Sequence, residues 1–356
     1  HFSTMILRSI TVSIVLTSFH ILAVVSNEEE RPKVLSEHQR VFEYHKRGYK
    51  WPPEPDMYKP NTEGWRNLSN RRFDQAPFLK TVVDKYDLWI VGVASAFVQP
   101  NFTETGWGLT RAPDDLVKTL RETIRSAYDA GDYREEGDVD VIDGLPALFI
   151  DRPELTERVL HELHPMHEAW AGIPLQPHLA YGFRLYRNES SLLMHIDKSD
   201  THIISCILHI DSSDDAEPWP IVIEDFTGKT NEVILTPGDM LFYESSKCFH
   251  GRPSKFIGSW YSSVFVHYFP SSPEWKEMDH HLEAHYAVPE NWDKPPSWES
   301  RLPAVEMKGA SFREPTCPND WCNLADAIRH HGPAKMDYVM TTGPSIYPLW
   351  GSSDEL

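Results

Sequence analysis

The sequence of 356 residues carries 53 acidic and 34 basic side chains, which gives a net charge of −19 at neutral pH. This excess of negative charge argues against nucleic acid or an anionic membrane surface as a partner. The length suffices for one large domain or for a core with sizeable extensions. Four cysteines are too few for a disulfide-dense scaffold, and the sequence contains no CxxC pairs that would suggest a zinc site.

The first expected segment is a secretory signal peptide over residues 5–26. It combines one basic residue, Arg8, with an apolar stretch and a small-residue end at Ser26. A single membrane anchor is the alternative, but Ser, Thr and His interrupt the apolar run, and a span needs about 20 predominantly apolar residues. We therefore expect this segment to be cleaved, with no stable membrane insertion afterwards.

The other end of the sequence reads Ser353-Asp354-Glu355-Leu356, which resembles the retrieval signal of the endoplasmic reticulum. Together the two segments predict a protein of the endoplasmic reticulum lumen with the retrieval receptor as a partner, and secretion is the alternative. Three glycosylation sequons, at Asn67, Asn101 and Asn188, fit the same compartment and would make the protein a glycoprotein.

Residues 27–112 are predicted to form an N-terminal extension. Its first part, residues 27–75, is polar and lacks clear periodicity, so we expect an irregular arm with one helix near residues 37–47. An apolar run within residues 86–98 predicts a buried strand.

Two amphipathic helices are predicted next. The first covers residues 116–130, where apolar side chains recur every four positions after Pro113 and two acidic residues that suit a first turn. The second opens at Pro153, continues to the region of Trp170 and ends at Gly172.

Short β-branched or aromatic segments separated by polar turns follow the helices. Helices followed by many short strands predict an α+β chain whose body, residues 113–270, is a jelly roll, or double-stranded β-helix. Residues 271–356 are predicted to be a C-terminal extension that wraps the core, with one short helix near residues 324–330. The predicted strands cover residues 179–186, 192–197, 203–211, 219–224, 232–235, 240–244 and 259–269.

The cysteines form two pairs of different character. Cys317 and Cys322 lie five residues apart and are expected to form a local disulfide. Cys206 and Cys248 both fall in strand-like core segments, where they either pair across strands or stay as buried thiols.

Two H-x-D pairs, His195/Asp197 and His209/Asp211, are candidates for a metal-binding motif. Residues two apart on a strand point to the same face, so each pair offers an imidazole and a carboxylate together. His209 closes an apolar run typical of a central strand, and Asp211 begins a polar turn. His195 lies at a strand's rim, where a site open to solvent belongs. With His250 from a later strand, His195 and Asp197 would form the facial triad that holds non-haem Fe(II).

Further features around this pair resemble the Fe(II)/2-oxoglutarate-dependent dioxygenases, within them the prolyl 4-hydroxylase-like and lysyl hydroxylase-like catalytic domains, over about residues 150–270. Tyr186 precedes His195 by nine residues, and Pro237-Gly238-Asp239 forms a strong turn. His250-Gly251-Arg252-Pro253 begins 55 residues after His195 and is followed by the last predicted strand. Five features in this order and spacing are more specific than H-x-D alone.

The resemblance implies His195, Asp197 and His250 as the iron ligands and Tyr186 as a hydrogen-bond donor to the cosubstrate carboxylate. It implies Fe(II) as the cofactor, 2-oxoglutarate as the cosubstrate and ascorbate as a candidate accessory. It also implies an oxidoreductase that hydroxylates a protein or peptide side chain, with proline or lysine the most plausible. Five aromatic residues near the triad are expected to line its pocket or to fill the core: Phe242, Tyr243, Phe249, Trp260 and Tyr261.

One position departs from the family pattern. Trp260 stands ten residues after His250, where the family places an arginine or lysine that binds the far carboxylate of 2-oxoglutarate. An indole donates one N–H but cannot neutralise a carboxylate. Another cation must then take this role if 2-oxoglutarate binds. The candidates are Arg252, Lys255, Lys247 and Arg184. Arg252 is slightly favoured, and Arg184 shares a strand face with Tyr186.

Two other functions are compatible with the sequence. The tryptophan at the cation position also suits a non-catalytic, chaperone-like glycoprotein of the lumen built on a dioxygenase scaffold. The same metal ligands would also serve a metal-dependent oxygenase that does not use 2-oxoglutarate.

Overall fold

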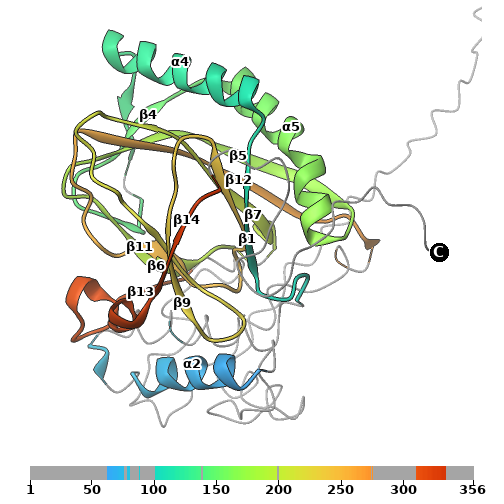
Figure 1. The fold of residues 1–356 in the computed structure, drawn as a ribbon, viewed down its shortest axis with the longest axis vertical. Coiled ribbons are helices and arrows are strands. Elements are labelled where there is room, and N and C mark those ends of the chain that lie inside the picture. The colour runs from blue at the N-terminus through green and yellow to red at the C-terminus, as the bar shows by residue number, and fades with distance from the viewer. Residues whose placement is uncertain are drawn as a thin grey trace, which may run out of the picture.

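Two sheets that face each other form the body of the protein (Figure 1). The computed structural model describes residues 62–75, 78–80, 88, 101–137, 139–198, 200–273, 275 and 310–333. Eight consecutive strands, β5 to β12, are divided equally between the two sheets and pair antiparallel, which is the jelly-roll arrangement. The predicted α+β chain with a jelly-roll core is therefore confirmed.

The first sheet provides the wall that packs against helices. Its strands follow the order β1-β10-β7-β12-β5-β4-β2, and all neighbours run antiparallel. Since both faces of its central strands are covered, β7 and β10 are buried along almost their whole length. The bounds are β1 Trp107–Arg111, β10 Asp239–Glu244, β7 Ile204–Ser212, β12 Trp260–Pro270, β5 Leu175–Arg187, β4 Leu148–Ile150 and β2 Arg134–Glu135.

The second sheet carries the H-x-D strand. Its order is β13-β6-β11-β8-β9-β14, with β3 also paired to β6, and only the β9–β14 pairing is parallel within the described residues. Strands β6 and β9 thus gain β13 and β14 as partners from the C-terminal extension. The bounds are β13 Ala310–Phe312, β6 Ser191–Ile196, β11 His250–Arg252, β8 Ile221–Glu224, β9 Thr230–Ile234, β14 Ile328–His331 and β3 Ile142–Asp143.

Helices α4 (Asp114–Ala130) and α5 (Pro153–Ala171) cover the outer face of the first sheet (Figure 1). Each ends at a glycine in the left-handed region, Gly131 with φ 69° and Gly172 with φ 70°, which stops the helix without a Cβ clash. Their apolar faces join the sheet in one core cluster. It includes Leu116, Leu120, Ile124, Val159, Leu163 and Trp170 from the helices.

Alternation along β12 sorts its side chains between this outer core and the space between the sheets. Trp260, Val264, Val266 and Tyr268 belong to the core cluster that faces the helices. Tyr261, Phe265 and His267 point to the other side, where they meet an interior aromatic cluster or a cavity. The period of two along a strand explains this division.

Helix α2 (Glu63–Asp74) lies against the second sheet, at the end of the molecule opposite α4 and α5 (Figure 1). Its Arg72 forms ion pairs with Glu224 of β8 and with Glu314 of the C-terminal extension. The guanidinium also lies 3.8 Å from the ring centroid of Trp321. This buried cluster joins the two extensions to the jelly roll.

Some predicted elements differ from the observed ones. The helix expected near residues 324–330 is wrong, because that stretch holds the end of a 3₁₀ helix (Cys322–Asp326) and strand β14. Pairing with β9 overrides the local helical preference. The arm expected to be irregular contains α2, and β1 lies within the predicted N-terminal extension yet pairs with β10.

Other predictions fall on residues that the structure does not describe. These are the signal peptide at 5–26, the helix near 37–47, the strand at 86–98 except residue 88, and the retrieval-like tail at 353–356. Within the described ranges, no helix is both long and apolar enough to cross a membrane.

The cysteines follow one of the two predicted arrangements. Cys317 and Cys322 form a disulfide, with their Cα atoms 4.7 Å apart. Cys206 and Cys248 are both buried free thiols, and burial raises the pKa of each thiol well above its usual value. They are therefore apolar core residues rather than a second bridge.

Candidate metal centre and its cavity

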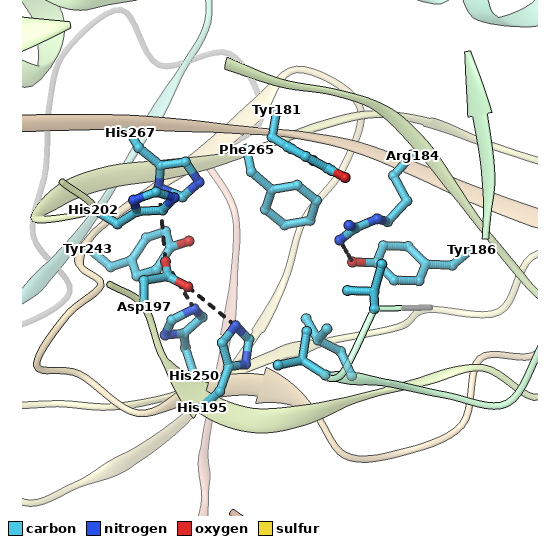
Figure 2. Close-up of a pocket in the computed structure, with 13 residues that line it drawn as sticks. Tyr181, Arg184, Tyr186, His195, Asp197, His202, Tyr243, His250, Phe265 and His267 are labelled. Atoms are coloured by element: carbon cyan, nitrogen blue, oxygen red, sulfur yellow. Dashed lines mark hydrogen bonds and ion pairs between the residues drawn. The ribbon is translucent and has the colours of Figure 1, made fainter. Parts of the chain in front are cut away.

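The three expected metal ligands converge in the space between the sheets (Figure 2). His195 lies on β6 and His250 on β11, and the register of these antiparallel strands places the two residues directly opposite each other. Their ring centroids are 4.2 Å apart. Asp197 follows the end of β6, where its backbone N–H donates to the carbonyl of Ser245 at 2.9 Å. Two paired strands therefore bring the cluster together.

Hydrogen bonds to the backbone orient both imidazoles. The Nδ1 atom of His195 donates to the carbonyl of Leu193 at 2.7 Å, and that of His250 donates to the carbonyl of Cys248 at 2.9 Å. Because a carbonyl only accepts, each Nδ1 carries the proton and each Nε2 keeps a free lone pair. The two Nε2 atoms lie 3.5 and 3.7 Å from the carboxylate oxygens of Asp197.

The protonation states also suit a metal. Burial opposes ionisation of Asp197, but His250, His195 and His267 around it hold the pKa of its carboxyl well below the usual range. Burial and the neighbouring His195 lower the pKa of His250 to about 4, against the opposite effect of Asp197. At neutral pH the carboxylate is therefore ionised and the His250 imidazole neutral, which are the forms that bind metals.

The donor atoms of this cluster are suited to binding Fe(II). Asp197 Oδ2 is buried and has no hydrogen-bond partner among the described residues, so a cation would supply its missing contact. The three ligand atoms lie within 4.8 Å of one another. Two imidazoles and one carboxylate form the donor set of the facial triad, which leaves coordination positions open on Fe(II). The residues present fit this metal.

A cavity of about 290 Å³ adjoins the triad, at the small end of the range for ligand sites. Figure 2 shows the triad on one side of it and Arg184 and Tyr186 on the other, with Tyr181 and Phe265 between them. The remaining lining residues are Val139, Val141, Leu192, His202, Tyr243 and His267.

Arg184 of β5 is the arginine that lines this cavity. Its Nη1 donates to the hydroxyl of Tyr186 at 3.3 Å, so these two candidate cosubstrate residues are in contact. Its Nε and Nη2 donate to the two carboxylate oxygens of Glu136 at 2.6 and 2.7 Å. The side chain is therefore held in one orientation although it is buried.

Arg252 occupies a different place. It is 2 % exposed, but it does not line the cavity within the described part of the chain. Its guanidinium lies between the rings of Trp219 and Tyr261, at 4.7 and 4.6 Å from their centroids. It donates to the carbonyl of Trp219 and to the hydroxyl of Tyr261. Of these two candidates the structure thus places Arg184 in the cavity lining, and not Arg252, which the sequence slightly favoured.

The two candidate lysines also lie away from the cavity lining. Lys255 is exposed and pairs with Glu189 at 3.0 Å. Lys247 is buried and donates to the side chain of Asn101. Neither amine faces the triad across the cavity in the way that Arg184 does.

Trp260 does not fill the position of a cosubstrate cation. Its indole packs in the outer core, with its ring centroid 5.4 Å from that of Tyr128 on α4. The inward residue is the next one, Tyr261, which is the cross-strand partner of Tyr186. Counting ten residues from His250 therefore reaches the wrong face of β12.

One of the aromatic residues expected near the triad lines the cavity, and the others pack in the core. Of the five, Tyr243 alone lines the cavity as the structure describes it. Phe242 packs against Trp170 of α5, with centroids 5.2 Å apart, and Phe249 stacks on Trp321 at 5.6 Å. Most of this set is therefore core.

The second H-x-D pair is structural. His209 is 2 % exposed and stacks on Tyr261 with ring centroids 4.1 Å apart. Burial lowers the pKa of His209 to about 3, so the ring is neutral. Asp211 turns outward to Arg125 at 2.6 Å and Arg121 at 3.3 Å. The structure does not bring this pair to the triad.

Four polar residues of the site, among others, escaped the sequence reasoning. His202 and His267 lie beside Asp197 with their ring centroids 4.0 Å apart, and Tyr181 and Glu136 flank Arg184. Alternation along β12 would have pointed His267 to the same side as Tyr261. Glu136 carries no local signal, because its role depends on a partner 48 residues away.

Comparisons with known proteins give distant similarities only. No protein-family model matches the chain. No curated protein matches it either. Solved structures that are similar include a prolyl-4-hydroxylase from Pseudomonas putida, at 16 % identity and a TM-score of 0.35, with 51 % of this chain and 100 % of that chain covered.

Two further similar structures were solved with bound ligands. HygX from Streptomyces hygroscopicus with nickel and 2-oxoglutarate bound has 12 % identity and a TM-score of 0.35, covering 47 % of this chain and 83 % of that one. A prolyl hydroxylase from Trichoplax adhaerens in complex with a hypoxia-inducible-factor peptide has 11 % identity and a TM-score of 0.37, covering 57 % and 98 %. Similarities at this level establish no shared activity, which must be argued from the residues of the site.

Proposed function

We propose that the protein is an Fe(II)/2-oxoglutarate-dependent oxygenase that hydroxylates a protein side chain, with proline or lysine as the substrate class. One observation carries the proposal. The facial triad of His195, Asp197 and His250 faces, across a small cavity, an arginine and a tyrosine that are in contact with each other. A metal-binding end and an anion-binding end on opposite walls suit an acid that bridges the two.

In this proposal the residues at the two ends of the cavity have different roles. His195, Asp197 and His250 would hold the metal and leave its remaining positions open on the cavity side. Arg184 and the hydroxyl of Tyr186 would bind the far carboxylate of 2-oxoglutarate.

When bound, Fe(II) with 2-oxoglutarate and O₂ supplies the oxidation of an unactivated C–H bond to an alcohol, with succinate and CO₂ as the other products. The chain itself must keep bulk water from the reacting centre. Val139, Val141, Leu192 and Phe265 provide apolar lining for this purpose. Tyr243 and His267 place polar groups beside the metal ligands.

The compartment and the partner are part of the proposal. We propose a lumenal protein of the endoplasmic reticulum that acts on protein or peptide substrates, with ascorbate as an accessory. Support comes from the signal-like segment at 5–26, the sequons and the terminal Ser353-Asp354-Glu355-Leu356. If cells secrete a tagged form of the protein whose last four residues are intact, the proposed retention in the endoplasmic reticulum is wrong.

The central experiment measures cosubstrate binding and turnover with purified protein. Mn(II) with 2-oxoglutarate should raise the melting temperature above the value with Mn(II) alone, because a ligand that binds only the folded state stabilises it. With Fe(II), ascorbate and proline- or lysine-containing peptides, the protein should release succinate, and His195→Ala should abolish the release.

Other outcomes point to the alternatives. No stabilisation by 2-oxoglutarate and no turnover would favour a non-catalytic binding protein. Metal-dependent O₂ consumption without 2-oxoglutarate would favour an oxygenase of another type. The tryptophan that motivated the first alternative packs against α4, outside the cavity, so the site itself gives it no support.

A further inference from the structure

Glu136 forms the closest contacts of the cavity arginine. Its two carboxylate oxygens accept from Nε and Nη2 of Arg184, and one of them also accepts from the hydroxyl of Tyr181 at 2.7 Å. Glu136 and Arg184 are each 6 % exposed. A side-on pair with two parallel hydrogen bonds is the geometry that orients a guanidinium most firmly.

This pairing leaves one edge of the guanidinium for a ligand. An arginine has five N–H donors in a fixed planar fork, and Glu136 uses one on Nε and one on Nη2. Nη1 is turned to Tyr186 and the cavity. A ligand carboxylate can therefore bind the Nη1 and Nη2 edge while Glu136 keeps its own two hydrogen bonds.

The segment that carries Glu136 is itself part of the cavity. Glu136 follows β2, its backbone N–H donates to the carbonyl of Ala147 at 2.8 Å, and Val139 and Val141 farther along line the cavity. Leu193 of β6, two residues before His195, donates its N–H to the carbonyl of Val141 at 2.8 Å. Glu136 is thus bonded to the arginine, and Val141 and Ile142 are bonded to β6.

Both ends of a bridging acid then meet fixed groups. At one end the metal ligands are oriented by backbone carbonyls, and at the other Arg184 is oriented by Glu136. An arginine side chain without such an anchor can move its charged end by rotation about several bonds and can follow ligands of different length. With the anchor, the separation between the two binding ends is set by the protein.

We infer that Glu136 is a positioning residue that holds Arg184 so that the cavity selects a dicarboxylic 2-oxo acid of one chain length. The inference rests on the proposed function, because it takes the metal and Arg184 as the two ends of the cosubstrate site. Glu136 itself does not touch the ligand. Glu136 therefore affects the relative Kd values of homologous acids and takes no part in the chemical step.

The experiment compares binding of three acids to the intact Mn(II)-loaded protein. Oxaloacetate, 2-oxoglutarate and 2-oxoadipate differ by one methylene at each step, and their Kd values are obtained by titrating the melting temperature or the tryptophan fluorescence. The wild type should prefer 2-oxoglutarate by about tenfold or more over each homologue, as a fitted pocket does for one methylene. Glu136→Gln and Glu136→Ala should reduce this preference about fivefold or more.

Glu135→Gln is the matched control. It removes the same charge from the neighbouring residue, but the Glu135 carboxylate is exposed and pairs with Arg187 outside the cavity. It should leave the preference unchanged within about twofold. Mn(II) affinity serves as a check that the triad is intact in every variant.

The outcomes separate this inference from the proposed function. If the wild type binds none of the three acids in the presence of Mn(II), the proposed cosubstrate site is wrong. If the wild type binds 2-oxoglutarate but shows no chain-length preference, or if both Glu136 variants keep the wild-type preference, the positioning role of Glu136 alone is wrong. A lower preference in both variants with Glu135→Gln unchanged supports the inference.

Discussion

His250 is the direct cross-strand partner of His195, and their ring centroids lie 4.2 Å apart. The backbone register of β6 and β11 sets this relationship, and hydrogen bonds from each Nδ1 to a backbone carbonyl fix both rings. The imidazoles therefore face the same point without needing a metal to gather them. Asp197, directly after β6, adds a negatively charged carboxylate to the two imidazoles.

The two H-x-D aspartates give a matched test of the metal site. Asp197→Asn removes the anionic ligand, and we expect the affinity for Mn(II) or Co(II) to fall about 100-fold or more. Asp211→Asn makes the same chemical change in the pair that binds Arg125 and Arg121. It should leave metal affinity within about twofold, since Asp211 lies outside the triad. Metal titration checks both, and equal losses would contradict the assignment.

Asp211 also predicts a pH dependence of stability. Burial opposes its ionisation, but hydrogen bonds from Arg125 and Arg121 keep the pKa of its carboxyl below the usual value. Because the folded-state pKa is lowered, the stabilisation is complete above the unfolded pKa of about 3.9 and is lost as the pH falls through the folded pKa. Asp211→Asn should lower the free energy of unfolding by about 1 kcal/mol at pH 7. Urea titrations should show this difference disappearing as the pH falls through the folded-state pKa of Asp211; a constant difference would contradict the prediction.

Replacing each candidate arginine by methionine should separate the two roles. Arg184→Met removes the cavity cation, so stabilisation by 2-oxoglutarate with Mn(II) should be lost, an effect of about 100-fold or more in Kd. Arg252→Met removes a cation held between Trp219 and Tyr261, and the Kd should change by about threefold or less. The free energy of unfolding of Arg252→Met should still fall by about 1–2 kcal/mol. The reverse pattern of Kd values would make Arg252 the cosubstrate residue.

Trp260→Lys tests whether the family's cation can be restored at its sequence position. The new ammonium would lie among apolar groups beside Tyr128 on α4, so the free energy of unfolding should fall by about 3 kcal/mol. The Kd for 2-oxoglutarate should not improve, because the side chain faces away from the cavity. Trp260→Phe is the size-reducing control. A lysine variant that binds 2-oxoglutarate tenfold tighter than the wild type would show that β12 presents this position inward.

Arg72 predicts a large effect on stability from the N-terminal extension. Its guanidinium lies between the buried carboxylates of Glu224 and Glu314, so Arg72→Met removes the ion pair of Glu224 and leaves Glu314 paired with Arg71. We expect the free energy of unfolding to fall by about 3–5 kcal/mol. Arg71→Met removes the half-exposed neighbour that also contacts Glu314, and should cost about 1 kcal/mol or less. Chemical denaturation of both variants checks the difference, which would vanish if the cluster were not formed.

The sequence predicted most of the jelly roll because its strands are long enough to show alternation or continuous burial. It placed His250 on a later strand but gave no bounds for β11, whose three residues are a histidine, a glycine and an arginine, so no apolar pattern marks it. It also missed β14, whose strand character comes from pairing with β9 rather than from its own residues.

The convergence of His195, Asp197 and His250 was predictable, because their spacing and order reflect one strand and its neighbour. The cation was not, since spacing alone cannot show a change of face. Alternation along β12 turns Trp260 toward the helices and Tyr261 into the space between the sheets. Arg184 could be found from its shared strand face with Tyr186, but its preference over Arg252 depends on long-range packing.

The strand that carries His195 is enclosed by pieces from distant parts of the sequence. On one side it pairs with β11, and on the other with β3 and with β13, where Ser311 is the partner of His195. A version of the protein cut at residue 270 would lack β13 and would expose part of the β6 edge to solvent and to other chains. The strand that carries His195 is therefore completed by β13, a segment that lies outside residues 113–270.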